Sequence, residues 1–249
     1  MFVYNESEVI KMILFCIPYA GGSEHVYSKW NKSFNNNIIV KPIKLKGRGS
    51  RFNEDFYNDI YESINDIYMQ MKPYINTHEY AIFGHSMGAL LTYELYYKIL
   101  KEKNPIPKHL FFSGFRSPSI KKDNDISYKM NDTVFLNMIA NLGGLPKEFF
   151  ENDELIELFL PILKNDFKLI EEYHYLKKET KIKCDITILN GIFDKISYPE
   201  KIAWRELCAK SCNLYDFKGD HFFINNCTKE VIKLIENTIQ SLAVPKLTI

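Results

Sequence analysis

Short apolar segments rich in β-forming residues recur along this chain and alternate with stretches of helical periodicity. Five of the segments occupy residues 11–17, 38–45, 80–84, 108–114 and 184–191, and a sixth occupies 212–219. Apolar residues recur at helical spacing over 55–75, 87–101 and 228–243. Strands that alternate with helices predict an α/β protein with a mostly parallel central sheet flanked by helices.

The interval between Arg116 and Lys183 interrupts this alternation, because it contains no convincing strand. Two helical patterns occupy it instead, at 132–144 and 152–176. Long insertions in compact domains are commonly functional, so we expect an inserted helical lid at about 116–183 in a single domain of residues 1–249. Helices that merely cover the sheet are the alternative.

Local residues predict where these two helices begin and end. Asp132 is the candidate N-cap of the first helix, and Gly143 is expected to stop it. Asn152 or Asp153 is expected to cap the second helix. Pro161 is expected to end or kink that helix, because proline lacks the N–H that a helix interior requires.

Composition argues against several classes of function. The 32 Lys and Arg residues against 31 Asp and Glu leave a net charge of +1, which does not favour binding to nucleic acid or a membrane surface. No apolar stretch approaches the ~20 residues of a membrane-spanning helix, and no signal peptide is evident. The five cysteines are odd in number, and Cys208 and Cys212 lack a second ligand pair, so we expect reduced thiols, no metal and a cytoplasmic location.

One serine stands between two glycines at a predicted junction of strand and helix. Gly84-His85-Ser86-Met87-Gly88 follows the apolar YAIF and precedes ALLTY. In this context G-x-S-x-G is typical of a nucleophile on a tight turn. The turn strains the backbone at the serine, and flanking side chains would clash, so glycine is required on both sides. Ser86 is the candidate nucleophile.

A serine needs a base to activate it, and several histidines compete for that role. His85 adjoins the serine, but alternation along the strand points it away. His78 and His109 are expected at the surface, and His174 on a helix of the insertion. His221 lies in a glycine-containing loop between the last strand and the last helix, at the carboxyl edge of the sheet. His221 is the predicted base.

The acid that orients this base is expected between the serine and the histidine in chain order. Asp194 lies in a turn directly after a predicted strand. Asp185 begins that strand, Asp216 lies within the next one, and Asp220 adjoins His221 where it cannot easily reach Nδ1. Asp194 is therefore the predicted acid, which would fix the imidazole tautomer without accepting its proton.

Backbone amides are expected to stabilise the oxyanion of the reaction. Met87 follows the nucleophile at a helix N-terminus, where free N–H groups and the helix dipole favour negative charge. The segment PYAGGS at 18–23 follows the first strand, and its two glycines leave backbone N–H groups open. The predicted donors are the amides of Ala20 and Met87, and a glycine turn without chemistry is the alternative for the first of them.

Together these residues resemble the type II thioesterases that accompany non-ribosomal peptide and polyketide synthases, within the α/β-hydrolase fold. The segments that resemble the family, in order and over nearly the whole chain, are PYAGGS (18–23), KLKGRGSRF (44–52), FGHSMGAL (83–90), FFSGFRSP (111–118), LGGLPKE (142–148), LFLPILKNDFKLIEEYHY (158–175), NGIFD (190–194) and GDHFFI (219–224). Two positions depart from the pattern. Lys46 replaces a usual proline, and Asp220 replaces a usual glycine beside the base, where an inward-turned carboxylate would raise the pKa of the base.

The resemblance implies a Ser-His-Asp hydrolase of acyl or aminoacyl thioesters, which a carrier protein bears on its 4′-phosphopantetheine arm. Such an enzyme edits or regenerates blocked synthases. The partner would be an acyl or peptidyl carrier protein that docks transiently, and the enzyme would need no cofactor of its own. We expect a monomer. A carboxylesterase or lipase, an acyltransferase and a non-catalytic binding protein of the same fold remain alternatives.

Two groups of residues in the insertion have a functional and a structural interpretation. Apolar side chains either line an acyl channel or form ordinary core: Phe135, Met138, Leu155, Phe159 and Leu163. Basic side chains at its start either meet an acidic carrier or its phosphate, or are simply solvated: Arg116, Lys121 and Lys122.

Overall fold

The computed structural model describes residues 12–35, 37–120, 126–144 and 147–243, and these contain a six-stranded sheet. Its strands are β1 (Met12–Ile17), β2 (Ile38–Pro42), β3 (Tyr80–His85), β4 (His109–Ser113), β5 (Asp185–Gly191) and β6 (Cys212–Phe217). They run in the order β2-β1-β3-β4-β5-β6, and every pairing is parallel. The predicted parallel sheet is confirmed, although β2 ends earlier than expected.

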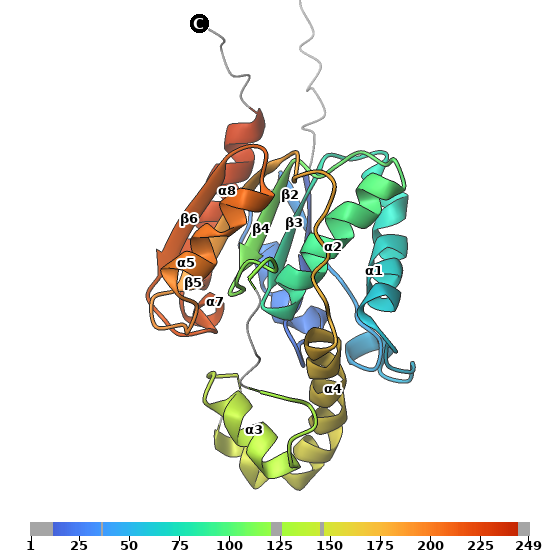
Figure 1. The fold of residues 1–249 in the computed structure, drawn as a ribbon, viewed down its shortest axis with the longest axis vertical. Helices are drawn as coiled ribbons and strands as arrows, with labels where there is room; N and C mark the ends of the chain where they lie inside the picture. The colour runs from blue at the N-terminus through green and yellow to red at the C-terminus, as the bar shows by residue number, and fades with distance from the viewer. Residues whose placement is uncertain (1–11, 36, 121–125, 145–146, 244–249) are drawn as a thin grey trace, which may run out of the picture.

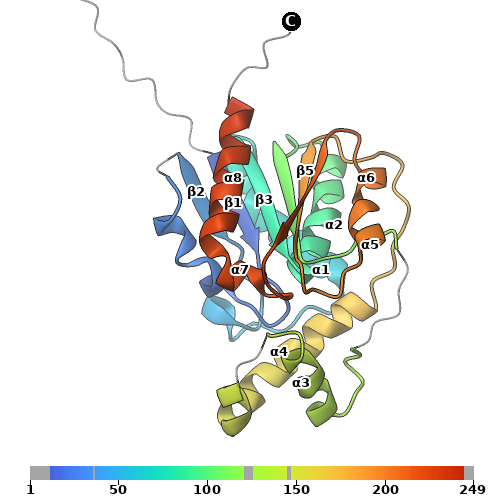
Figure 2. The same ribbon diagram turned by 90° about the vertical axis from the view of Figure 1, so that its left-hand side faces the viewer.

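Helices cover both faces of this sheet (Figures 1 and 2). The long ones are α1 (Ile60–Ile75) and α2 (Met87–Lys101) on one face and α8 (Thr228–Ala243) on the other. Alternate residues of β1 serve the two faces: Phe15 joins the core under α1 and α2, and Leu14 joins the core under α8. A strand buried on both faces is apolar at every position, as in this sequence.

Shorter elements lie between the strands and the long helices. They are η1 (Glu24–Tyr27), η2 (Trp30–Lys32), η3 (Gly49–Arg51), α5 (Tyr198–Ile202), α6 (Trp204–Leu207) and α7 (Phe223–Asn226). The longer α1 shows why the periodic patterns fold as predicted. The side chain of Asp59 accepts the N–H of Glu62 as the N-cap, and the predicted positions Ile60, Ile64 and Met71 are buried.

The residues between β4 and β5 form α3 (Asp132–Ala140), η4 (Lys147–Glu151) and α4 (Asp153–Glu171), which lie beyond the carboxyl ends of the strands (Figures 1 and 2). We call residues 126–171, as far as they are described, the α3–α4 segment. This segment has a small apolar cluster of its own, separate from the two cores of the sheet. The buried members are Ile126, Phe135, Leu136, Ile139, Phe149 and Leu163.

Three details of the α3–α4 segment differ from the predictions. Asn131, and not Asp132, caps α3, since its side chain accepts the N–H of Thr133 at 3.0 Å. The helix α3 ends at Ala140, before Gly143.

The third difference concerns α4, which Asn152 caps as predicted. Of the two effects expected of Pro161, ending the helix does not occur, because α4 continues to Glu171. Pro161 is exposed, so the carbonyl that its missing N–H leaves unpaired can bind water. Because α4 ends at Glu171, His174 lies in the coil beyond the helix and not on it.

All five cysteines are free thiols, and Cys16, Cys184 and Cys208 are buried. Among the described residues, no helix combines the length and the hydrophobicity that crossing a bilayer requires.

Candidate active site

Ser86 lies on a strained turn between β3 and α2. Its φ and ψ of 53° and −118° are unusual for a residue with a side chain. An ideal Cβ at Gly84 would lie 2.1 Å from the carbonyl oxygen of Gly88, and one at Gly88 would lie 2.2 Å from that of Ile17. Since these neighbours are backbone atoms, no side chain fits at either glycine, as predicted from the G-x-S-x-G pattern.

The structure brings Ser86, His221 and Asp194 into one hydrogen-bonded chain. His221 Nε2 lies 2.9 Å from Ser86 Oγ, and His221 Nδ1 lies 2.9 Å from Asp194 Oδ2. The three residues follow β3, β6 and β5, whose carboxyl ends meet at one edge of the sheet. The side chains of His221 and Asp194 are only 13% and 4% exposed. This arrangement can activate a serine hydroxyl.

Close backbone contacts fix the loops that carry the acid and the base. An ideal Cβ at Gly191, the last residue of β5, would lie 2.1 Å from the carbonyl oxygen of Asp220. Asp220, which replaces the usual glycine of the family, does not disturb this geometry. Its side chain is exposed, and its Oδ1 accepts the N–H of Phe222 at 2.9 Å. Lys46, the other position that departs from the family pattern, pairs with Glu62 on α1 at 2.8 Å.

The two predicted oxyanion donors belong to segments that border Ser86. Met87 opens α2 directly after the serine, and Ala20 lines the same cavity as Ser86 and His221. Ala20 lies in a tight turn in which the N–H of Gly22 donates to the carbonyl of Tyr19 at 2.9 Å. These positions are those that an oxyanion hole requires, at a helix N-terminus and in an adjacent loop.

The competing carboxylates are engaged elsewhere. Asp216 on β6 pairs with Lys201 at 2.6 Å and is about half exposed. Asp185 at the start of β5 accepts the N–H of Ser211 at 3.0 Å, at the opposite end of the strand from the serine.

Two histidines that do not take part in the Ser86–His221–Asp194 hydrogen bonds are also buried. The prediction of a surface position is wrong for His109, which is 2% exposed and whose Nε2 lies 2.8 Å from Thr187 Oγ1. Burial lowers its pKa to about 4. His85 is fully buried, and its ring packs against that of His221 with centroids 5.3 Å apart. Burial, and then the neighbouring His221, hold the pKa of His85 well below its usual value.

A cavity of about 210 Å³ opens beside Ser86 and His221. Its apolar wall comes from the α3–α4 segment and from loops of the sheet: Phe115, Ile126, Met138, Leu142, Phe167, Ile170 and Ile196. Of the apolar residues proposed from the sequence, Met138 lines this cavity, whereas Phe135 and Leu163 belong to the buried cluster of the segment. Leu155 is 37% exposed.

Other residues of the cavity were missed by the sequence analysis. Phe167 and Ile170 lie on α4 within the helical pattern, but periodicity does not tell which turn of a helix meets the nucleophile. Lys195 was also missed, whereas Arg116, which borders the cavity too, was among the basic residues singled out from the sequence. Lys121 and Lys122 lie outside the described residues. Among the residues that are described, His, Cys, Asp and Glu side chains form no group of three able to hold a metal ion.

Comparisons with known proteins agree with this geometry. The family model "Thioesterase domain" matches residues 12–239. Linear gramicidin dehydrogenase LgrE of Brevibacillus parabrevis is 34% identical over 94% of this chain and 90% of its own length. ClbQ from the colibactin NRPS/PKS pathway is 34% identical, with a TM-score of 0.89 over 94% of this chain and 98% of its own.

The type II thioesterase BorB from the borrelidin biosynthetic cluster is 26% identical, with a TM-score of 0.82 over 91% of this chain and 92% of its own. The expected α/β-hydrolase fold and the resemblance to type II thioesterases are confirmed by these likenesses. Since the family model spans nearly the whole chain, the protein belongs to the thioesterase family.

Proposed function

We propose that the protein is a serine thioesterase that hydrolyses acyl or aminoacyl thioesters on the 4′-phosphopantetheine arm of carrier proteins. The observation that carries the proposal is the chain Ser86–His221–Asp194 at the edge of an apolar cavity, with 2.9 Å between neighbouring atoms. The likeness to ClbQ, a protein of an NRPS/PKS pathway, supports a carrier-bound substrate. Removal of aberrant acyl groups from a blocked synthase is the proposed purpose.

In the first half of the reaction, Ser86 Oγ attacks the thioester carbonyl while His221 Nε2 takes the hydroxyl proton. Asp194 holds Nδ1–H and stabilises the imidazolium. The amides of Ala20 and Met87 stabilise the oxyanion. The C–S bond then breaks, His221 gives its proton to the departing thiolate, and the acyl group remains on Ser86.

In the second half, His221 takes a proton from water, and the resulting hydroxide attacks the acyl-serine carbonyl. The C–O bond to Ser86 breaks, and His221 returns the proton to Oγ. The products are the free carboxylic acid and the carrier with its thiol restored. No metal or dissociable cofactor takes part in these steps, because the pantetheine belongs to the carrier. A cytoplasmic location is proposed, since the free thiols suit a reducing compartment.

The name of LgrE refers to a different reaction, a dehydrogenation. A dinucleotide site of the doubly wound type has a G-x-G-x-x-G pattern in the turn after the first strand. The turn after β1 here reads PYAGGSEH over residues 18–25, and its two adjacent glycines do not form this pattern. The strained serine and its histidine therefore favour acyl transfer to water over hydride transfer.

The test is to incubate the protein with several acyl-loaded carrier proteins and to follow the released arm by mass spectrometry. We expect hydrolysis, with a clear preference for carrier thioesters over p-nitrophenyl esters. The Ser86→Ala and His221→Ala variants should each fall to near background, because such residues act as a unit.

Three outcomes would contradict the proposal. A preference for the free esters would indicate a carboxylesterase. A serine-directed fluorophosphonate that fails to label Ser86 would indicate a non-catalytic protein. Recovery of the acyl group on an added alcohol or amine instead of as free acid would indicate an acyltransferase.

A further inference from the structure

A buried ion pair joins α4 to the loop that follows β2. Asp166 on α4 is 0% exposed, and Arg48 in the loop is 2% exposed. Arg48 Nη2 donates to Asp166 Oδ1 at 2.7 Å, and Nη1 donates to Asp166 Oδ2. Arg48 Nε also donates to the carbonyl of Lys46 at 3.2 Å. This bidentate contact fixes both the position and the orientation of the Asp166 carboxylate.

The same carboxylate binds the loop that follows β1. The N–H of Gly21 donates to Asp166 Oδ2 at 2.7 Å. Gly21 has a φ of +80°, and an ideal Cβ there would lie 2.6 Å from Leu163 Cδ2 on α4. Leu163 and Asp166 are three residues apart and share one face of the helix. One face of α4 therefore lies directly on this loop, at a glycine that permits the close contact.

The bound loop is a four-residue turn with Ala20 and Gly21 at its centre. The N–H of Gly22 closes the turn on the carbonyl of Tyr19 at 2.9 Å, and the positive φ of Gly21 is typical of a type II turn. The turn uses the N–H of Gly22, and Asp166 uses that of Gly21. These two hydrogen bonds therefore determine the direction in which the adjoining N–H of Ala20 points.

We propose that Asp166 is a positioning residue that aims the Ala20 N–H at the oxyanion, and that Arg48 keeps this buried carboxylate paired and correctly oriented. The inference rests on the proposed role of Ala20 as an oxyanion donor. Arg48 is needed because an unpaired buried carboxylate is strongly destabilising. Since α4 also supplies Phe167 and Ile170 to the cavity, docking of α4 completes the acyl pocket and the oxyanion hole together.

Two double variants separate the positioning role from a merely structural one. Arg48→Met with Asp166→Asn removes the ion pair but keeps an oxygen that can accept the Gly21 N–H. Arg48→Met with Asp166→Leu removes the ion pair and the acceptor. Kinetics are measured on p-nitrophenyl butyrate and, in parallel, on an acyl-carrier thioester. If the leucine variant does not fold, Asp166→Ala with Arg48→Met replaces it.

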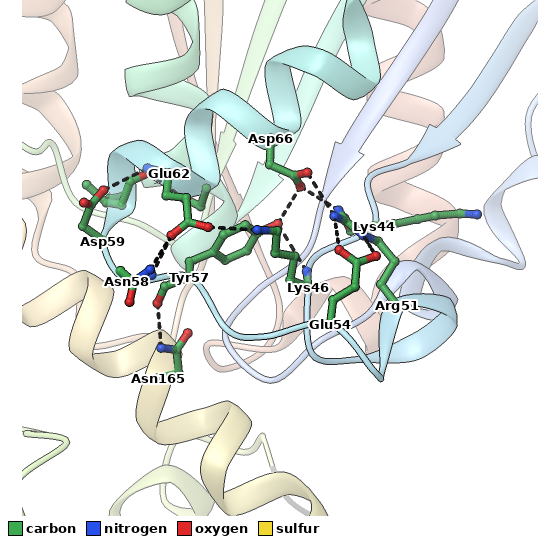
Figure 3. A network of polar contacts seen from close by, with 12 residues as sticks. Lys44, Lys46, Arg51, Glu54, Tyr57, Asn58, Asp59, Glu62, Asp66 and Asn165 are labelled. Carbon is green, nitrogen blue, oxygen red and sulfur yellow. Dashed lines mark hydrogen bonds and ion pairs between the residues drawn. The ribbon is translucent and has the colours of Figure 1, made fainter.

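Loss of one oxyanion donor lowers kcat by roughly 10²–10³-fold, and a misdirected donor should cost about 10–100-fold. We expect this loss of kcat in the leucine variant, with little change of KM. The asparagine variant should stay within about threefold of the wild-type kcat. The matched control is Asn165→Ala, which breaks another contact between α4 and the body, the 2.9 Å hydrogen bond from Asn165 Nδ2 to the carbonyl of Tyr57 (Figure 3). Its kcat should be unchanged.

Equal kcat values for the two double variants would overturn the inference, and so would a loss in Asn165→Ala as large as that of the leucine variant. The kinetics on p-nitrophenyl butyrate alone decide whether Asp166 has the positioning role. If the carrier thioester is not hydrolysed while the esters still rank the variants as expected, the proposed substrate fails and the positioning role of Asp166 stands.

Discussion

At the scale of single residues, Asp194 offers the sharpest test of the proposed chemistry. Its buried Oδ2 lies 2.9 Å from His221 Nδ1, so Asp194→Asn keeps the shape but favours the wrong imidazole tautomer. We expect kcat to fall by about 10³–10⁴-fold in a protein that unfolds near the wild-type temperature. The matched control is Asp216→Asn, which removes the ion pair between Asp216 on β6 and Lys201. Wild-type activity in Asp194→Asn, or a large loss in Asp216→Asn, would transfer the role of the acid to Asp216.

A second residue-scale prediction concerns His109 and the pH dependence of stability. Burial lowers its pKa to about 4 in the folded protein, below the ordinary value near 6.5 of the unfolded chain. Between these two values the unfolded chain binds more protons, so stability is present above about pH 6.5 and is lost as pH falls toward 4. His109→Gln should reduce this loss by an amount on the order of 3 kcal/mol.

The measurement is the urea-unfolding free energy of both proteins between pH 4 and pH 7. Part of the pH dependence should remain in the variant, because His85 is also buried with a lowered pKa. The control variant is His78→Gln, at an exposed histidine. An unchanged profile in His109→Gln would show that this histidine is not the buried neutral group that the geometry indicates.

At the scale of elements, Pro161 is an exposed proline in the interior of α4. It removes one hydrogen bond from the helix, and a proline in such a position costs up to ~3 kcal/mol relative to alanine. The unfolded chain gains entropy when proline is replaced, which offsets ~0.4–1 kcal/mol of that benefit. Pro161→Ala should therefore raise the free energy of unfolding by up to about 2 kcal/mol, measured by urea denaturation. A lower stability would show that the ring makes a contact whose loss outweighs the restored hydrogen bond.

Local patterns predicted most elements, because local residues determine them. The strands were recognisable because their apolar residues face two cores. The turn that carries Ser86 was recognisable because only glycine fits at Gly84 and Gly88. The buried contact between Arg48 and Asp166 joins residues 118 apart, and no local pattern announces it. The burial of His109 depends likewise on Thr187 of the neighbouring strand. Contacts between residues distant in sequence were predicted only where motif order implied them, as for Ser86, Asp194 and His221.

At the scale of the whole molecule, the candidate site lies between two bodies of unequal size. The sheet and its helices supply Ser86, Asp194 and His221, whereas the α3–α4 segment supplies part of the apolar wall of the cavity. The helix α4 belongs to both bodies. Leu169, near the end of α4, packs in the core under α1 and α2, and Leu163 packs in the cluster of the α3–α4 segment. This division suits a lid that moves about the anchored end of α4.

Hydrogen exchange can test whether the segment opens as a unit. Its small cluster has far fewer buried residues than either core of the sheet, so we expect the amides of α3 to exchange at least about tenfold faster than those of α2. Labelling Ser86 with an alkyl fluorophosphonate should place an apolar chain in the cavity against Met138 and Phe167, and should slow exchange in α3. Mass spectrometry of peptic fragments measures both effects, with α2 as the internal reference. If α3 exchanges as slowly as α2, or if the label leaves its exchange unchanged, the segment is a fixed wall of the cavity and not a lid.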